Sequence, residues 1–415
     1  MANSLTAAEA ARRLGVKPAT LYAYVSRGVL SRNKAADGRG SQFDADEIER
    51  LARRGRPRRP AGTVDITLES AITEITADSL RFRGFDVTRL AVSRSFEEIA
   101  ELLWTGEFQR AKATRTGTGE PWRATPAALA VGRGAQAVLP AGILPLERLQ
   151  VIVPAIATTD ALRLQLDQSA VLAAGRNLVA GMVDCLPAPP GTDAAAPASA
   201  SGSIAERLWS RLADGRPSPG LLRALSAALV LLADHELAAS TLAVRAAASV
   251  RADPYAVVGT GLGAMSGTLH GGASLGAETL LAAARGPADV PRVVGELLRR
   301  GEKVPGFGHF VYRGGDPRAL TLLGLVRRAA PKSGQLAVAE AVLAEMRQKS
   351  LPAPNIDFAV ATLARVAGMI TGAGEAIFAV SRTAGWIAHA LEAYTADNPL
   401  RPRAVYTGRP AITEP

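Results

Sequence analysis

The stretch "KVPGFGHFVYRGGDPRAL", residues 303–320, places a histidine directly after a glycine hinge and shortly before an arginine. His309 is one of only four histidines in 415 residues, so its position between "PGFG" and Arg318 is informative. Glycines have no side chain, and they let a ligand approach the backbone closely. The stretch therefore predicts part of a ligand-binding site, for which Arg318 and Arg313 look equally eligible.

The composition around this stretch favours an all-helical protein. Hydrophobic residues make up 48% of the chain and aromatic residues only 5%, while the helix formers alanine and leucine are plentiful. The longest apolar run, residues 224–233, is about half as long as a membrane span. Cys185 is the only cysteine, which rules out an internal disulfide and is typical of a reducing compartment. No signal peptide is visible, so we expect a cytoplasmic protein without membrane contact.

The positive charge is concentrated in the first 60 residues. They hold 13 Lys and Arg against 6 Asp and Glu, a balance of +7, whereas the whole chain carries +10. The sequence "TAAE", residues 6–9, predicts a capping box at the start of a first helix, and Pro18 fits the first turn of a second. Residues 33–43 are polar and glycine-rich, which predicts a loop or wing, and Asp44 begins a third helix.

Two short helices followed by a wing resemble the small winged helix-turn-helix of the MerR and excisionase type. We expect this domain over residues 1–52, followed by a basic, proline-broken linker at 53–62. In that family the second helix enters the major groove of DNA. The candidates for DNA contact that the resemblance implies are Lys17, Thr20, Tyr22, Tyr24, Arg27 and Arg39. The alternative is a helical docking module that touches no DNA.

Helical patterns dominate the rest of the chain, with three exceptions. The alternation in "AITEITADSLRFRGFDV", residues 71–87, predicts a small hairpin. Residues 111–127 are polar and turn-rich, and residues 187–203 are rich in Pro, Ala and Ser. We expect both of these low-complexity stretches to be surface segments that contribute little to the core.

Metal and nucleotide signatures are weak. The four histidines are separated by at least 35 residues and there is one cysteine, so no spacing predicts a zinc site. The glycines of "GTGLGAMSG", residues 259–267, lack the preceding strand and the acidic residue of a dinucleotide-binding motif. We therefore expect no metal and no permanently bound cofactor.

Besides the opening stretch, three clusters carry residues that could do chemistry. "DHELAAST" contains His235, "TLHGGA" contains His270, and "PNIDF" contains Asp357. Arg382 follows in the apolar segment "FAVSRTAGWIAHALE". Taken singly, His235 fits a helix C-cap, Asp357 fits an N-cap, and Arg382 fits a core ion pair. His389, in the same segment as Arg382, is given a structural role.

Taken together, the clusters fit one kind of chemistry. Arginines bind the carboxylates of a small acid bidentately. A histidine can polarise a carbonyl that is to be attacked. A positioned carboxylate can remove a proton from a carbon acid while a second donor holds the enolate oxygen.

The clusters also resemble, in unbroken order, the signatures of citrate synthase. The matching motifs are "DHELAAST", "TLHGGA", "KVPGFGHFVYRGGDPRA", "PNIDF", "FAVSRTAGWIAHALE" and "RPRAVYTG". The resemblance spans residues 63 to the C-terminus, apart from the two low-complexity stretches. It implies an all-α homodimer with a large domain at 63–270 and 370–415, and a small domain at 271–369 that closes over the substrates. The implied reaction condenses acetyl-CoA with oxaloacetate and then hydrolyses the thioester.

The resemblance also implies a role for individual residues. Asp357 matches the base that removes the methyl proton, His270 the donor to the enol oxygen, and His309 the residue that polarises the oxaloacetate carbonyl. The residues that match binders of oxaloacetate are His235, Arg318, Arg382 and, reaching in from the other subunit, Arg401. The backbone strip that matches the adenine site of CoA comprises Lys303, Val304, Pro305, Gly306, Phe307 and Gly308. Arg313 matches no role in the family, and it is expected to be a solvated charge.

The chain departs from the family pattern near the expected acyl site. Ser274 stands where the family usually has Asn after "HGGA", and Ala238 stands where an Asn commonly precedes "AST". Residues 359–361 are small, where a Tyr and a Ser or Gly are frequent. No catalytic group is lost, but these changes bear on which acyl-CoA is preferred.

Two alternatives stay open from the sequence. The first is a 2-methylcitrate synthase that uses propionyl-CoA. The second is a DNA-binding regulator whose synthase-like body senses a small acid or a CoA ester.

Overall fold

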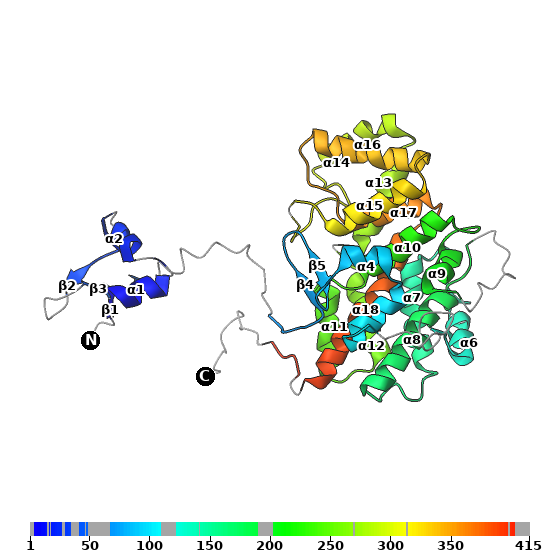
Figure 1. Cartoon of the computed structure of the whole chain (residues 1–415), viewed down its shortest axis with the longest axis horizontal. Helices are drawn as coiled ribbons and strands as arrows, with labels where there is room; N and C mark the ends of the chain where they lie inside the picture. The colour runs from blue at the N-terminus through cyan, green and yellow to red at the C-terminus, as the bar shows by residue number, and fades with distance from the viewer. Residues whose placement is uncertain are drawn as a thin grey trace, which may run out of the picture. The chain divides into compact units, whose positions relative to one another are not determined.

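The chain divides into two compact units, Met1–Glu69 and Ser70–Pro415, drawn in Figure 1. The computed structural model describes residues 4–14, 16, 18–26, 30–34, 41–45, 47–48, 67–108, 122–140, 142–189, 202–268, 270–312, 314–396 and 399–402. The predicted basic linker at 53–62 lies outside these residues.

The first unit combines two helices with a small antiparallel sheet. Its elements are β1 (Ser4–Thr6), α1 (Ala7–Leu14), α2 (Pro18–Ser26), β2 (Asn33–Lys34) and β3 (Ser41–Asp44), with sheet order β1-β3-β2. The predicted capping box is present, because the Thr6 N–H donates to Glu9 at 2.9 Å and the Glu9 N–H donates to Thr6 Oγ1 at 3.3 Å. β2 and β3 pair in the predicted wing, and Leu21 and Phe43 lie in the unit's own buried core.

Only part of the predicted third helix belongs to the described residues. There the Glu47 N–H donates to Asp44 Oδ1 at 2.9 Å, which agrees with the prediction that Asp44 begins this helix. Glu47 in turn accepts from the Ser31 N–H at 2.9 Å, so it ties this segment to the chain before β2.

The second unit begins with the predicted hairpin. β4 (Thr73–Ile75), β5 (Leu80–Phe82) and β6 (Phe85–Asp86) form an antiparallel sheet in which Thr73 lies opposite Phe82. Asp86 ends the sheet and caps the first helix of the unit, accepting from the Arg89 N–H at 3.1 Å.

Helices make up the remainder of the second unit. They are α4 (Val87–Ser93), α5 (Phe96–Thr105), α6 (Pro126–Gly134), α7 (Pro145–Ala157), α8 (Gln168–Cys185), α9 (Ile204–Leu212), α10 (Pro219–Leu232), α11 (Ala239–Ser249), α12 (Pro254–Met265), α13 (Gly272–Ala283), the short 3₁₀ helix η1 (Pro287–Asp289), α14 (Val290–Arg299), α15 (Pro317–Ala329), α16 (Gly334–Gln348), α17 (Ile356–Val366) and α18 (Ala373–Thr395). Among the residues described, no helix is both long enough and apolar enough to span a membrane.

Helix α18 is the central element of this unit. Of its 23 residues, 20 are buried, which is the pattern of a helix surrounded on all sides. It packs against α5, α7, α8, α10, α11 and α12, as well as α13 and α17 (Figure 1). Arg382 therefore lies deep inside the protein, where an unpaired charge is costly.

The expectation that residues 111–127 add little to the core was wrong at Trp122. This side chain is 5% exposed, and its ring stacks on Trp104 with 5.2 Å between centroids. Pro126 already begins α6, so the turn-rich composition ends earlier than predicted. An indole buries a large apolar area, and it can join a core even from a polar segment.

Helices α13 to α17 gather at one end of the second unit (top of Figure 1). α17 packs on both α13 and α15, and α14 packs on α16. His270 lies just before α13, whereas Arg318 and Asp357 lie in the first turns of α15 and α17. This arrangement brings three distant sequence motifs to one place.

Candidate active site

Six of the seven predicted catalytic and substrate-binding side chains lie in one electrostatically connected cluster. The rings of His235 and His309 are 5.2 Å apart between centroids, and His309 Nε2 lies 3.4 Å from a terminal nitrogen of Arg318. Each of the remaining members interacts electrostatically with Arg382 or Arg318. The cluster comprises His235, His270, His309, Arg318, Asp357 and Arg382.

Arg318 is fixed by a buried carboxylate that the sequence interpretation had not singled out. Asp316 caps α15 and binds Arg318 bidentately, at 3.0 Å to Nε and 2.8 Å to Nη2. The same carboxylate accepts from the Ile356 N–H at 3.0 Å, which joins the starts of α15 and α17. Among the described residues, Nη1 of Arg318 has no hydrogen-bond partner. It is therefore free to bind an external acceptor.

Arg382 differs from Arg318 because it has no ion pair among the described residues. Its Nε donates to the Leu232 carbonyl at 2.8 Å, and its guanidinium lies over the Phe378 ring at 4.7 Å. Burial lowers the pKa of Arg382 to about 10, although the nearby Asp234 opposes the shift. The group is still cationic at neutral pH. A buried cation without a bound carboxylate is suited to an anionic ligand.

The backbone determines which nitrogen of His309 carries the proton. Its Nδ1 accepts from the N–H groups of Val311 at 3.0 Å and Tyr312 at 3.3 Å. Burial and the charge of Arg318 lower the pKa of His309, so the ring is neutral and its proton is on Nε2. Nε2–H and the Arg318 guanidinium are then two donors side by side. An oxygen atom of a ligand would satisfy both.

His235 is held by Tyr312 at the wall of the same cluster. Its Nε2 lies 3.2 Å from the Tyr312 hydroxyl, and Tyr312 itself is buried. Burial, reinforced by Arg318 and Arg382, lowers the pKa of His235 well below its ordinary value. Burial and the two nearby arginines thus keep His235 neutral, so it can act as a hydrogen-bonding group.

His270 lies immediately before α13 and is held by a serine of α11. Its Nε2 is 2.8 Å from Ser240 Oγ, and its ring meets Phe378 edge to face. Burial lowers the pKa of His270 to about 4, with a smaller effect from Arg382. The imidazole is therefore neutral at pH 7. If Ser240 donates to Nε2, the ring proton lies on Nδ1, which has no partner among the described residues.

Asp357 is the carboxylate of the cluster. Asn355 caps α17 by accepting from the Asp357 N–H at 3.0 Å, which places the carboxylate in the first turn. Ser274 donates to Asp357 Oδ1 at 2.6 Å. Burial raises the pKa of Asp357, although Ser274 and Arg318 oppose the shift. A carboxylate with a raised pKa is a stronger base than one in water.

The strip at residues 303–308 is tied to the segment before α17. The Gly308 N–H donates to the Ala353 carbonyl at 2.8 Å, and the Asn355 N–H donates to the Gly306 carbonyl at 2.9 Å. A Cβ on Gly306 would lie 2.7 Å from Phe358 Cβ, and its φ is +80°. Close packing against Phe358 therefore requires a glycine at position 306, in addition to the ligand approach expected from the sequence.

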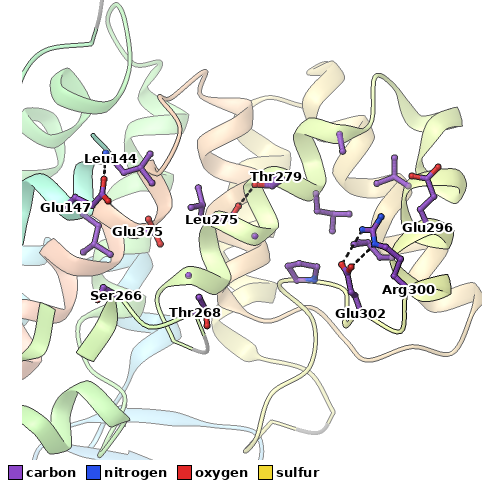
Figure 2. A pocket seen from close by; sticks show the side chains of 18 of the residues that line it. Leu144, Glu147, Ser266, Thr268, Leu275, Thr279, Glu296, Arg300, Glu302 and Glu375 are labelled. Carbon is purple, nitrogen blue, oxygen red and sulfur yellow. Dashed lines mark hydrogen bonds and ion pairs between the residues drawn. The ribbon is translucent and has the colours of Figure 1, made fainter. Parts of the chain in front are cut away.

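A cavity of about 940 Å³ opens beside this strip (Figure 2). It is bounded by Pro305, by Thr268 close to His270, and by residues of α7, α13 and α14. Glu375 points into it from the first turn of α18 and is 5% exposed. Burial raises the pKa of Glu375 to about 7, aided by two nearby carboxylates. The volume suits a small-molecule ligand of ordinary size.

The other predicted residues lie apart from the cluster or outside the described residues. Arg401 is exposed, in a segment fixed by a hydrogen bond from the Leu400 N–H to Ser249 Oγ at 3.0 Å. In the first unit Thr20 is half-buried, Tyr22 is exposed and Tyr24 packs against the core. The DNA-contact candidates outside the described residues are Lys17, Arg27 and Arg39, and Arg313 is also outside them.

The buried polar residues that hold the cluster were missed from sequence. Asp316 could have been found, because an Asp before a Pro at a helix start is a capping signal. Ser240, Ser274 and Tyr312 carry no such signal, since each contacts a residue far away in the chain. In the described part of the chain, no group of three or more His, Cys, Asp or Glu side chains could hold a metal ion.

Comparison with known proteins identifies the fold and the class. The family model for the C-terminal domain of citrate synthase matches residues 62–403, and a helix-turn-helix model matches residues 4–56. Citrate synthase 2 of Bacillus subtilis is 30% identical over 364 residues, covering 83% of this chain and 94% of that protein. A 2-methylcitrate synthase of Mycobacterium tuberculosis is also 30% identical, over 366 residues, covering 83% and 88%.

A solved structure matches the arrangement of the helices. It is the ternary complex of carboxymethyl coenzyme A and oxaloacetate with citrate synthase from Thermoplasma acidophilum, with a TM-score of 0.70 at 24% identity, covering 85% of this chain and 96% of that one. Fold and relatives together define a condensing enzyme of the acyltransferase class. The chain belongs to the citrate synthase family, and it carries a helix-turn-helix domain at its N-terminus.

Proposed function

We propose that the chain is a citrate synthase, which condenses acetyl-CoA with oxaloacetate and hydrolyses the thioester to give citrate and CoA. The observation that carries the proposal is the pairing of two buried guanidiniums with free nitrogen atoms and one half-buried carboxylate of raised pKa. Arg382 and Arg318 provide charge for a dianionic acid, and Asp357 provides a base.

Oxaloacetate would be bound by the positive side of the cluster. Arg382 and Nη1 of Arg318 would bind its carboxylates, and His235 would hydrogen-bond beside them. His309 Nε2–H would donate to the keto oxygen, which makes the keto carbon more electrophilic. The neutral state of His309, due to burial and to Arg318, leaves this proton available as a hydrogen-bond donor.

Acetyl-CoA would be activated on the other side. Asp357 would take a proton from the methyl carbon while Nδ1–H of His270 donates to the thioester oxygen. The methyl group is a weak acid, so shared proton transfer avoids a full enolate charge. The nucleophilic carbon then bonds to the keto carbon, and water cleaves the C–S bond of the resulting thioester to release CoA.

CoA would lie along residues 303–308. The cavity beside Pro305 and Thr268 gives room for the rest of the molecule next to His270. Support comes from the structural neighbour of Thermoplasma acidophilum, which binds a CoA derivative together with oxaloacetate.

Closure of a small domain at 271–369 over a large domain at 63–270 and 370–415 would exclude water until the carbon–carbon bond has formed. Both proposed boundaries fall in turns: one precedes α13, and the other contains Gly368 and Gly372 with φ of +65° and +80°. In the proposed homodimer, Arg401 would reach the site of the other subunit. Its exposed position is compatible with this role.

The proposal is tested by following CoA release with purified full-length protein, oxaloacetate, and either acetyl-CoA or propionyl-CoA. We expect oxaloacetate-dependent release with acetyl-CoA as the preferred donor. A preference for propionyl-CoA would instead establish the 2-methylcitrate synthase alternative, which a 30% identical relative supports. No turnover with either donor would contradict the enzyme proposal.

We propose further that the first unit binds DNA through α2 and its wing, as the helix-turn-helix family match supports. Tyr22 on α2 is exposed, and Arg32 lies over its ring at 5.9 Å. Affinity for a DNA duplex should fall steeply between low and physiological salt, because phosphate contacts release counterions. Affinity that does not depend on salt, or none at all, would leave this unit as a docking module.

A further inference from the structure

One hydroxyl group contacts the proposed base directly. Ser274 lies on the third residue of α13, is fully buried, and donates to Asp357 Oδ1 at 2.6 Å. Among the described residues, no other side chain hydrogen-bonds to the Asp357 carboxylate. The two oxygen atoms of this carboxylate are therefore not equivalent: Oδ1 has a partner, and Oδ2 is left for a substrate.

Close packing holds Ser274 in its position. A Cβ on Gly374 would lie 3.3 Å from Ser274 Cβ and 2.8 Å from Glu278 Oε1, so α13 and α18 touch here without intervening side chains. Glu278, one turn further along α13, accepts from the N–H groups of Gly372 at 2.9 Å and Gly374 at 2.7 Å. The serine is thus fixed between the base and the start of α18, with little freedom to rotate away.

We propose that Ser274 is a positioning residue for the reaction: its hydroxyl binds Oδ1 of Asp357 and turns Oδ2 toward the methyl group of the acyl-CoA. This inference rests on the proposed function, because it assigns Asp357 as the base. It gives Ser274, a departure from the family pattern, a role at the reacting carbon.

The charged groups around Asp357 set the expected direction of its titration. Arg318 lowers its pKa from α15 and Arg382 lowers it from α18, while Asp316 and, above all, burial raise it. Before and along α13, the titratable groups nearest to Ser274 in the sequence are the neutral His270 and the Glu278 carboxylate. A hydrogen bond favours the ionised form of a carboxylate, so loss of the Ser274 hydroxyl would raise the pKa of Asp357 further.

The first experiment compares Ser274→Ala with wild type in kcat and KM across pH. We expect kcat at pH 7 to fall about 10-fold, since a displaced base loses part of its acid–base contribution, with both KM values within about twofold. The acid limb of the kcat profile should move to higher pH. Ser274→Cys, which keeps the size but is a weak donor, should lie between wild type and the alanine variant.

A matched control is Thr362→Val on α17. Thr362 is fully buried, and its hydroxyl donates only to the Phe358 carbonyl within the helix, at 2.8 Å. This variant loses a buried hydroxyl on the helix that carries Asp357 but should keep the wild-type acid limb. An acid limb that is unchanged in Ser274→Ala, or displaced equally in Thr362→Val, would overturn the proposal.

A second measurement separates this inference from the proposed function. Infrared titration of the full-length protein without substrates follows the carboxyl group of Asp357, assigned as the band that is missing in Asp357→Asn. The midpoint of this band should move to higher pH in Ser274→Ala, whether or not the protein turns over acyl-CoA. Coincident midpoints would overturn the role of Ser274 even if citrate synthase activity is present. If the midpoint moves in Ser274→Ala but the wild-type protein shows no turnover, the assigned reaction would be overturned and the contact between Ser274 and Asp357 would stand.

Discussion

The proposed active site has two halves that are built differently. The acceptor half, comprising His235, His309, Arg318 and Arg382, is positively charged. It is held by backbone carbonyl and N–H groups, by Asp316 and, at His235, by the Tyr312 hydroxyl. The donor half, comprising His270 and Asp357, is held by one serine hydroxyl for each residue. Preformed charge suits recognition of a dianion, whereas proton removal depends on single contacts that orient one atom. Substitutions in the two halves should therefore have different kinetic effects.

Asp357→Asn should have the largest effect. The amide keeps the size and the Ser274 contact but cannot accept the methyl proton, so we expect kcat to fall about 10³-fold with little change in the KM for oxaloacetate. Steady-state CoA release checks this prediction. A variant with near wild-type kcat would show that another group is the base.

Arg382→Leu should have the second-largest effect, and it should weaken the binding of oxaloacetate. Removal of a buried guanidinium that binds a carboxylate should lower kcat/KM for oxaloacetate about 10²-fold, mostly through KM. Arg327→Gln provides a control, because Arg327 is partly exposed and pairs with Glu340 at 2.7 Å, outside the cluster. Equal losses in the two variants would contradict the specific role of Arg382.

Ser240→Ala should have a smaller effect on the donor half. His270 would lose the contact that fixes its ring, and we expect kcat to fall about 10-fold while the KM for oxaloacetate stays within about twofold. A rise in the KM for oxaloacetate, without loss of kcat, would mean that Ser240 serves the acceptor half.

Glu375→Gln should have its effect on the pH dependence of stability. Because burial raises the pKa of Glu375 to about 7, its ionisation costs stability as pH rises from its unfolded value of 4.5 through 7. The glutamine variant should therefore be more stable than wild type by about 3 kcal/mol at pH 8, and nearly equal to it at pH 4.5. Urea unfolding at both pH values measures the difference. Equal stability at pH 8 would show that Glu375 is solvated.

Sequence reasoning predicted the side chains that the structure gathers in one cluster, but it missed the groups that hold them. His309 and Asp357 lie in short motifs with glycines and caps, which are local signals. Ser274 meets Asp357 across 83 positions and Tyr312 meets His235 across 77, and such contacts depend on how α13, α15 and α17 pack. The helical class and the hairpin followed from composition and alternation. Trp122 did not, because burial of one large ring outweighed the polar composition around it.

The division into an acceptor half and a donor half is tested most directly by the affinity of the Asp357→Asn variant for oxaloacetate, measured by calorimetry beside wild type. We expect the two dissociation constants to agree within about twofold, although the variant makes almost no citrate, because the dianion would contact only the acceptor half. Loss of oxaloacetate binding together with loss of turnover would contradict this division, since Asp357 would then belong to the binding site of the acceptor as well.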